Sequence, residues 1–395
     1  MPARGRRPPF PLHPVLAALI LAAAPTAAAA GIGFAPYLEL GARYDSNLLR
    51  VADAARGETM REASVGGAFE WLRGRQAFEL SGRLSDVDYH RLRRFDHTAH
   101  ELSARLDYGI GEAVSGIAGY DRSRELDDFG DRDADLRDLV TTQQPFLQTD
   151  IAITPAWIVR ARLGELRVEH SEAERQRFDR RHDDWEIQLR HRAGSTFEAG
   201  LGLSRDDIEF PGRDADDPLG RAATQETRFV DGVWEYSAIS RLRARVGHTR
   251  REIDGLSGRD FSAPTWRLAY ERTVSVKTRL TLDVFRRIYS SGSVDASFIE
   301  ATGAQLRLDW RYSPKIALDA RLYHEEENYE GGVTTASGNR EDRIRGAELE
   351  ARYALTRTLH WIATLAAEEQ SSNRPASEYD YWRGGLALRL TLDDD

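Results

Sequence analysis

Charged residues recur at every second position in many stretches of this sequence, as in Arg307-Leu308-Asp309-Trp310-Arg311. If such a stretch is a β-strand, all of its charges lie on one face, because successive side chains point to opposite sides. A charged face that lines a water-filled bore lets a hydrated solute pass without binding it tightly. The chemistry that this spacing suggests is therefore passive permeation, with no covalent step.

The predicted pore lining is a set of arginines and acids that share the charged face of their stretches. It comprises Arg105, Asp107, Arg160, Arg162, Arg243, Arg245, Arg279, Asp283, Arg307, Asp309, Arg311, Asp319, Arg321, Glu348, Glu350 and Arg352. The mixture of signs argues against strong selection of anions or of cations, and opposite charges on neighbouring strands can pair. We expect these residues to act collectively, with none of them essential. The alternative is a solvated wall that prefers no solute.

Signatures of catalysis are absent from the sequence. Neither G-x-S-x-G nor H-E-x-x-H occurs, and His248, His324 and His360 fall in different expected strands without a readable partner. A lone histidine on a strand more often belongs to a wall than to an active site. We therefore predict that the protein is not an enzyme, that it has no catalytic residues and that it needs no cofactor.

An acidic stretch between residues 127 and 135 resembles the start of a calcium loop, with its D-x-D-x-D spacing at Asp131, Asp133 and Asp135. However, Leu136 stands where such a loop needs glycine, and Thr142 where it needs a bidentate acid. The sequence therefore predicts a solvated loop and no metal site, with loose binding of a divalent cation as the alternative.

The elements that must position the charges are hairpins such as Gly303–His324. Leu306, Leu308 and Trp310 share one parity with apolar neighbours, and the charges occupy the other. In a soluble β-sandwich the apolar face packs on a core, whereas in a membrane barrel it faces lipid and the polar face turns inward. The recurrence of the pattern along the chain decides between these two structures.

The alternation recurs in eighteen stretches. We expect strands at 33–44, 61–72, 76–89, 98–110, 113–125, 139–153, 156–169, 183–193, 195–208, 225–237, 239–253, 262–272, 275–290, 301–313, 315–328, 342–354, 357–370 and 380–392. Every second connection is short; the short ones lie at Arg73 to Arg75, Gly111-Glu112, Thr154-Pro155, Gly194, Ala238, Val274, Pro314 and Leu355-Thr356. Short turns on one side and long polar loops on the other are typical of outer-membrane barrels. Pro145 and Asp231-Gly232 disturb two of the strands.

This pattern predicts an all-β fold, namely a transmembrane antiparallel up-and-down β-barrel of about 18 strands of the outer-membrane type. An even number of strands puts both termini in the periplasm. The alternative is a soluble β-sandwich or propeller, neither of which explains the strict rhythm of long and short connections.

The first 30 residues have the composition of a secretory signal peptide. Arg4, Arg6 and Arg7 precede the apolar stretch 15–24, and small residues end at Ala30. We therefore expect residues 1–30 to be the signal peptide and residues 31–395 to form a single barrel domain. Removing the signal leaves 52 of the 55 basic residues against 64 acids, a net charge of −12. An acidic chain argues against a nucleic-acid partner.

A short segment near the start resembles a known family. Tyr44-Asp45-Ser46-Asn47-Leu48-Leu49-Arg50 is similar to the Tyr-Asp-x-Asn-Leu-Phe/Tyr-Arg segment that opens the EpsL-like β-barrel porins, the outer-membrane barrels encoded in exopolysaccharide operons. The family-motif residues are Tyr44, Asp45, Asn47, Leu48 and Arg50, and Leu49 departs from the usual aromatic residue. Elsewhere the likeness is one of length, strand rhythm and Arg/Asp-rich hairpins.

The resemblance implies an outer-membrane conduit for secretion of an exopolysaccharide. The implied partners are outer-membrane lipid, a periplasmic polysaccharide-export protein and the exopolysaccharide as cargo. Two alternatives remain open at this point: a general diffusion porin for small solutes, and a plugged structural or adhesive barrel. The alternation predicts the barrel, and only the resemblance suggests the cargo.

Overall fold

The computed structural model describes residues 32–130, 136–256, 260–291, 296–331 and 339–392. The strands within these ranges are β1 (Ile32–Asp45), β2 (Glu58–Arg73), β3 (Gln76–Tyr89), β4 (His97–Ile110), β5 (Val114–Leu126), β6 (Leu139–Ala152), β7 (Trp157–His170), β8 (Arg180–Ala193), β9 (Phe197–Glu209), β10 (Ala222–Ser237), β11 (Ser240–Ile253), β12 (Phe261–Ser275), β13 (Thr278–Ser290), β14 (Phe298–Ser313), β15 (Ile316–Glu330), β16 (Glu341–Ala354), β17 (Leu359–Ser372) and β18 (Tyr379–Thr391). The expected signal peptide, residues 1–30, and the acidic residues Asp131, Asp133 and Asp135 lie outside the described ranges.

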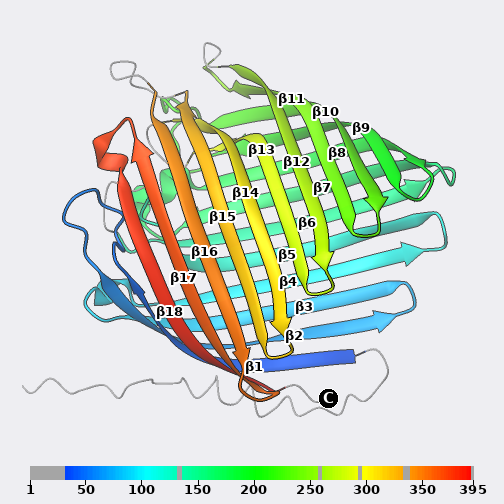
Figure 1. Cartoon of the computed structure of the whole chain (residues 1–395). Coiled ribbons are helices and arrows are strands. Elements are labelled where there is room, and N and C mark those ends of the chain that lie inside the picture. The colour runs from blue at the N-terminus through cyan, green and yellow to red at the C-terminus, as the bar shows by residue number, and fades with distance from the viewer. Residues whose placement is uncertain (1–31, 131–135, 257–259, 292–295, 332–338, 393–395) are drawn as a thin grey trace, which may run out of the picture.

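The strands form one closed antiparallel barrel in which each strand pairs with its neighbours in the sequence (Figure 1). Strand β1 closes the ring, because it pairs with both β2 and β18. At this seam Tyr37 lies opposite Thr391 and Asp45 lies opposite Arg383. The prediction of an up-and-down barrel of eighteen strands is confirmed.

The expected strand bounds agree with the structure to within three residues. The turn predicted at Val274 is wrong: β12 continues to Ser275, and the turn consists of Val276 and Lys277. The Ser275 hydroxyl accepts a hydrogen bond from the Lys277 amide at 3.2 Å and donates one to the Thr278 hydroxyl at 3.1 Å, which closes the hairpin later than expected.

The two strands whose alternation is disturbed by Pro145 and by Asp231-Gly232 are both formed in the structure. Pro145 lies within β6 opposite Tyr120 of β5, but the ladder with β7 is interrupted between Gln143 and Phe146. Proline has no N–H group to donate to a second neighbour, so this local gap is the expected cost. Asp231 and Gly232 lie in a continuous part of β10 and pair with β9 and β11.

The two ends of the barrel differ in their connections, and we call them the short-turn end and the long-loop end. At the short-turn end, tight turns such as those at Gly74 and Gly111 join consecutive strands, and both glycines have positive φ. At the long-loop end, the described parts of the connections contain the short 3₁₀ helices η1 (Arg93–Phe95), η2 (Ala173–Phe178) and η4 (Pro375–Ser377). None of the helices in the described ranges is long and apolar enough to span a bilayer.

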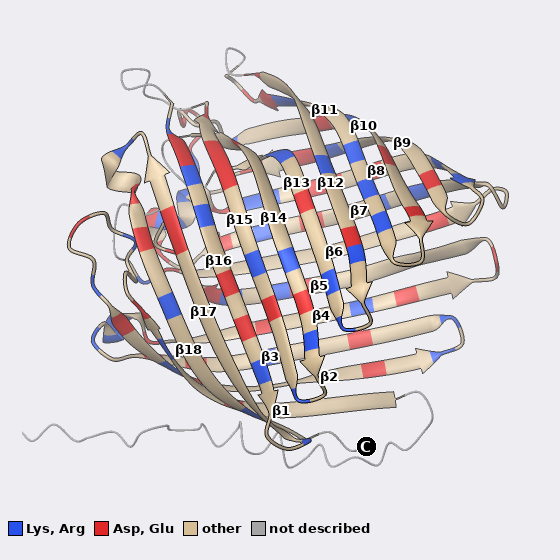
Figure 2. Cartoon of the chain, viewed as in Figure 1, with Lys and Arg blue, Asp and Glu red and all other residues tan. Residues whose placement is uncertain are grey.

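Ion pairs between strands that are not neighbours establish which face points inward. Arg245 of β11 contacts Glu186 of β8 at 2.8 Å, although two strands stand between them. Adjacent strands are about 4.8 Å apart, so these backbones are separated by about 14 Å. Side chains converge on the concave side of a barrel and diverge on its convex side. The charged parity therefore faces the interior, and Figure 2 shows the charges alternating with uncharged residues along the strands.

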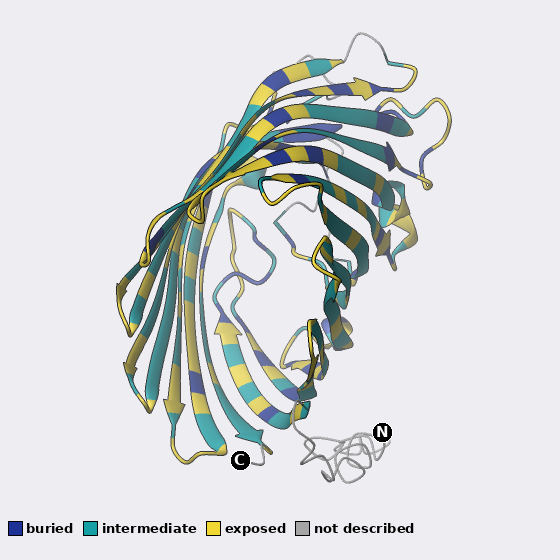
Figure 3. Cartoon of the chain, turned by 90° about the vertical axis from the view of Figure 1, so that its right-hand side faces the viewer, coloured by how far each residue is buried: buried dark blue, intermediate teal, exposed yellow. Residues whose placement is uncertain are grey.

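The opposite parity carries exposed apolar side chains. Leu282, Leu306 and Leu322 lie side by side on β13, β14 and β15 and are 40 %, 40 % and 54 % exposed. Exposure alternates along the strands in the same way around the barrel (Figure 3). Leucines that are open on the convex surface have no protein core to pack against, so this surface suits the hydrocarbon of a bilayer.

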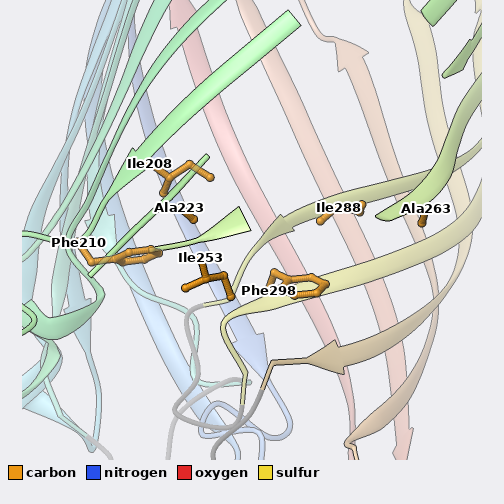
Figure 4. Packing of buried hydrophobic residues seen from close by; sticks show 7 residues of the cluster. All are labelled: Ile208, Phe210, Ala223, Ile253, Ala263, Ile288 and Phe298. Atoms are coloured by element: carbon orange, nitrogen blue, oxygen red, sulfur yellow. The ribbon is translucent and has the colours of Figure 1, made fainter. Parts of the chain in front are cut away.

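Buried apolar clusters of the described residues lie at the long-loop end. One contains Ile208, Phe210, Ala223, Ile253, Ala263, Ile288 and Phe298 (Figure 4). A second contains Leu48, Met60, Val87, Tyr89, Phe95 and Phe129. Both join strand ends to adjoining loop residues, so packing that a soluble protein would place at its centre is found here at one end of the barrel.

Candidate functional site

The inner wall of the barrel is the candidate functional site, and most of its predicted residues form ion pairs. Arg105 pairs with Asp107 at 2.7 Å, Arg160 with Asp150 at 2.6 Å, Arg162 with Asp184 at 3.6 Å, Arg279 with Glu271 at 3.8 Å, Arg321 with Glu348 at 3.5 Å, and Arg352 with Asp319 at 2.9 Å and Glu350 at 2.6 Å. Many of these side chains are partly exposed on the inner face. Water therefore reaches the wall, and the paired charges stiffen it without leaving a large excess of either sign.

Three predicted residues stay exposed and lack such a partner. Among the described residues, no carboxylate lies within ion-pair distance (4.0 Å) of Arg243, Arg307 or Arg311. An exposed guanidinium in water carries little energetic penalty, and it remains available to a passing anion. Of the predicted lining, these three arginines are therefore the residues most available to a passing anion.

Strands β14 and β15 place like charges opposite each other. Arg307 lies opposite Arg321, and Asp309 lies opposite Asp319. Directly opposed like charges destabilise a dry sheet, so this arrangement needs hydration or partners on the next strand. Asp319 has such a partner in Arg352, and Arg321 has one in Glu348. The register is thus compatible with a wet interior.

The sequence analysis missed Arg190, a buried arginine of the wall. Its side chain is 2 % exposed, and its guanidinium donates to Glu198 at 2.5 Å and to Asp231 at 2.7 Å. Arg267 was missed as well, although it pairs with Asp283 at 2.5 Å. Both residues occupy the inward parity of their strands, so the alternation was a signal that could have identified them.

A recess of about 370 Å³ in the inner wall gathers several of these groups. Arg245, Arg267, Asp283 and Arg321 line it together with aromatic residues that include Phe229, Phe285 and Tyr323. A second recess of about 420 Å³ is lined by Arg307, Asp319, Arg321, Glu348 and Glu350, among others. The predicted lining residues thus gather in patches on neighbouring strands. Open space remains between these patches and the rest of the barrel interior, because side chains do not fill the two recesses.

Glycines on the neighbouring strands make room for the rings of the first recess. Phe229 of β10 lies over Gly202 of β9, where a Cβ atom would collide with the ring. Arg245 lies against the same ring, with its guanidinium carbon 3.9 Å from the ring centroid. Ring and cation attract each other through the ring quadrupole. Gly202 therefore positions Phe229, and Phe229 positions Arg245.

Replacing Gly202 by alanine is expected to destabilise the folded barrel by about 1 to 3 kcal/mol, because the added methyl group overpacks the site and displaces Phe229. The measurement is a urea titration of the barrel folded in lipid vesicles. Gly384→Ala is the matched control, since a Cβ there meets only Leu365 and Trp382 at 3.5 and 3.6 Å. Equal midpoints for the two variants would show that Phe229 does not depend on the glycine.

The histidines that the sequence left without a partner lie on three separate strands. His248 of β11 contacts the Ser262 hydroxyl at 2.6 Å, and His324 of β15 lies 3.7 Å from Glu326. His360 is on β17, opposite Ala354 and Arg389. These three strands are separate, and the histidines are not brought together.

The segment Tyr44–Arg50 forms a buried connection between the loop after β1 and strand β18. We call this segment and its contacts the rim lock. Arg50 donates two hydrogen bonds of 3.0 Å to the Asp45 carboxylate, and Asp45 is 1 % exposed. The Arg50 guanidinium also lies 3.5 Å from the ring centroid of Tyr381 in β18. The Asn47 amide group donates to the Asp380 carbonyl at 3.0 Å. The motif thus ties the loop after β1 to β18, where the barrel closes.

The remaining motif residues anchor the rim lock on both of its sides. Leu48 is buried in the cluster that contains Met60 and Phe95. Tyr44 packs against Trp382 of β18 with 5.1 Å between the ring centroids. Arg50 has φ +52°, a conformation that is uncommon outside glycine and that its buried contacts maintain. In this structure the motif has a structural role, because it connects the loop after β1 to β18 at the long-loop end of the barrel.

Comparisons with known proteins agree with this architecture. The family model described as "Putative beta-barrel porin 2" matches residues 235–392. No curated protein sequence matches the chain. Among solved structures, OccK2 (OpdF) from Pseudomonas aeruginosa, in complex with glucuronate, has a TM-score of 0.50 at 13 % identity, covering 91 % of this chain and 98 % of that one. OpdK from the same organism has a TM-score of 0.49 at 12 % identity, covering 91 % and 99 %.

The likeness to OccK2 concerns the fold, because the sequence identity is low. The family match covers β11 to β18 and the end of β10, and so less than half of the chain. Together with the apolar outer surface and the charged inner wall, these findings lead to one conclusion. The chain has the fold of an outer-membrane porin, a closed antiparallel β-barrel.

Proposed function

We propose that the protein is a passive channel through which small hydrophilic solutes cross the outer membrane. The observation that carries this proposal is the inner wall, where exposed charges of both signs surround recesses that side chains leave open. A wall whose charges largely pair with one another offers polar contacts to a hydrated solute and no deep binding site. The protein needs no catalytic group for this function.

Planar-bilayer recording of the purified barrel without any partner tests the channel. We expect ion conductance with weak selectivity, because charges of both signs line the wall. Arg307→Glu reverses one unpaired inward charge and should move the reversal potential in a salt gradient toward cation selectivity. Lys315→Glu makes the same reversal in an exposed turn and should have the smaller effect. Absence of conductance in the wild type would contradict the proposal.

The second candidate function is secretion of an exopolysaccharide, together with a periplasmic polysaccharide-export protein. The observation in its favour is the resemblance of the Tyr44–Arg50 segment to the EpsL-like barrels. That segment forms the rim lock, where Asp45 and Arg50 are buried, so its contacts account for its residue types without any polymer. Neither the fold nor the comparisons favour export over diffusion of small solutes.

A gene deletion distinguishes the two candidates. A diffusion channel predicts slower entry of small hydrophilic solutes and an unchanged amount of surface polymer. An export conduit predicts loss of surface polymer with unchanged solute entry, and a barrel that is closed when recorded alone. Both candidates place the short-turn end and the two termini in the periplasm, which labelling of cysteines introduced into the turns at Gly74 and Gly111 would test.

A further inference from the structure

Two loops at the long-loop end bring together two carboxylates and an imidazole. Asp127 and Asp138 flank the loop between β5 and β6, and His170 ends β7. One ligand atom of each residue lies within 4.8 Å of those of the other two. The sequence analysis expected a solvated acidic loop here. It could not foresee that His170 would join the acids from the next loop along the rim.

Asp138 is the residue that distinguishes this cluster from an ordinary acidic surface. It is 0 % exposed, and its Oδ1 atom accepts hydrogen bonds from the Glu172 amide at 3.1 Å and the Ser171 hydroxyl at 3.3 Å. Its Oδ2 atom is buried and has no hydrogen-bond partner. A buried carboxylate oxygen without a partner is costly, so a ligand that satisfies it would be bound favourably.

His170 is held in the manner of a metal-binding imidazole. Its Nδ1 atom lies 2.9 Å from the Asp179 carboxylate, which also accepts a hydrogen bond of 2.7 Å from the His170 amide. A carboxylate bound to Nδ1 fixes the orientation of the ring and makes the other nitrogen, Nε2, the stronger ligand. The side chain of His170 is also nearly buried, which reduces the conformational freedom lost on binding an ion.

Arg175 is the cation that already approaches the cluster. Its guanidinium lies 3.9 Å from Asp138 Oδ2 and 3.7 Å from Asp127 Oδ2, beyond hydrogen-bond distance from both oxygens. Arg180 also carries a positive charge that acts on Asp127. A small divalent ion, unlike Arg175, could bind the oxygens of Asp127 and Asp138 directly.

We propose that Asp127, Asp138 and His170 form a binding site for a divalent transition-metal ion of the Zn²⁺ class. Imidazole nitrogen and carboxylate oxygen are both ordinary zinc ligands, whereas Ca²⁺ prefers oxygen alone. Asp127 is partly exposed, which leaves the ion a path from solvent. The ion would connect the loop after β5 to the loop after β7. It would act as a clamp at the long-loop end of the barrel, independently of solute passage.

The test is Zn²⁺ binding by the full chain folded in detergent and freed of metal by chelation, measured by calorimetry and by metal analysis after dialysis. We expect one Zn²⁺ per chain in the wild type and at least about tenfold weaker binding in Asp138→Asn and in His170→Gln. His248→Gln removes an exposed histidine on β11 and should bind as the wild type does. Arg175→Gln should bind Zn²⁺ more tightly, because it removes a competing cation.

The clamp has a second readout in limited proteolysis of the loops. Zn²⁺ should slow cleavage in the wild type and in His248→Gln, and it should have no effect in Asp138→Asn. Absence of stoichiometric Zn²⁺ in the wild type would overturn the proposal without any variant. Equal binding by His170→Gln and the wild type, or binding of Ca²⁺ in preference to Zn²⁺, would overturn it as well.

Discussion

Replacing Arg50 by alanine is expected to destabilise the barrel by about 3 to 5 kcal/mol, because it leaves the buried Asp45 carboxylate without its cation. Asp45 is 1 % exposed and receives both Arg50 hydrogen bonds, so water cannot take the place of the guanidinium. The variant also loses the contact between Arg50 and Tyr381 of β18. The loss falls on the seam between β1 and β18, where the ring of strands closes.

Equilibrium unfolding in urea, with the barrel inserted in lipid vesicles, measures this effect. Arg56→Ala is the matched control, since Arg56 lies in the same loop and is exposed, and it should change the unfolding free energy by less than about 0.5 kcal/mol. The double variant Asp45→Ala/Arg50→Ala should be more stable than Arg50→Ala, because it contains no unpaired buried charge. Wild-type stability of Arg50→Ala would show that the rim lock contributes nothing to closure of the barrel.

Replacing Leu306 by arginine is expected to cost about 2 to 4 kcal/mol in folding into a bilayer, the range for a basic residue at the bilayer midplane. Trp310 and Tyr312, with ring centroids 5.1 Å apart, mark the membrane boundary near the short-turn end of the same strand. Leu306 precedes Trp310 by four residues, about 13 Å along the strand and about 10 Å along the bilayer normal if the strand is tilted by about 45°. This places Leu306 near the middle of the apolar band.

The adjacent position provides the control for this prediction. Arg307→Gln removes a charge from the inner wall, and we expect a change below about 0.5 kcal/mol, because Arg307 is exposed and lacks an ion-pair partner among the described residues. Both variants are compared by urea titration and by the fraction that folds into vesicles. Similar losses in the two variants would mean that the assignment of inner and outer faces is wrong.

These two experiments test different parts of the barrel. Leu306 tests the outer surface, where the solvent is lipid and apolar side chains need no protein partner. Arg50 tests the long-loop end, where the chain builds the compact buried contacts that a soluble protein has at its centre. The inner wall between them is held by ion pairs that remain partly hydrated, so individual losses there should be small.

The sequence by itself determined the number of strands, their bounds to within a few residues, and the face that each side chain occupies. The reason is the period of two in a β-strand: once apolar and charged residues alternate, the orientation of Arg307 fixes that of Asp309 and Leu308. The rhythm of short and long connections fixed the order of the strands, since each tight turn pairs two neighbours in the sequence. The turn at Val276 and Lys277 was misplaced because it depends on local hydrogen bonds of Ser275, which the alternation does not encode.

The tertiary structure alone decided which charges meet. Arg245 and Glu186 are 59 residues apart in sequence and come together only because the sheet curves into a ring. Closure likewise puts Arg50 beside Tyr381, and the path of the loops puts His170 beside Asp127 and Asp138. Periodicity along one strand carries no information about such contacts. They depend on curvature, closure and loop conformation, which are properties of the complete barrel.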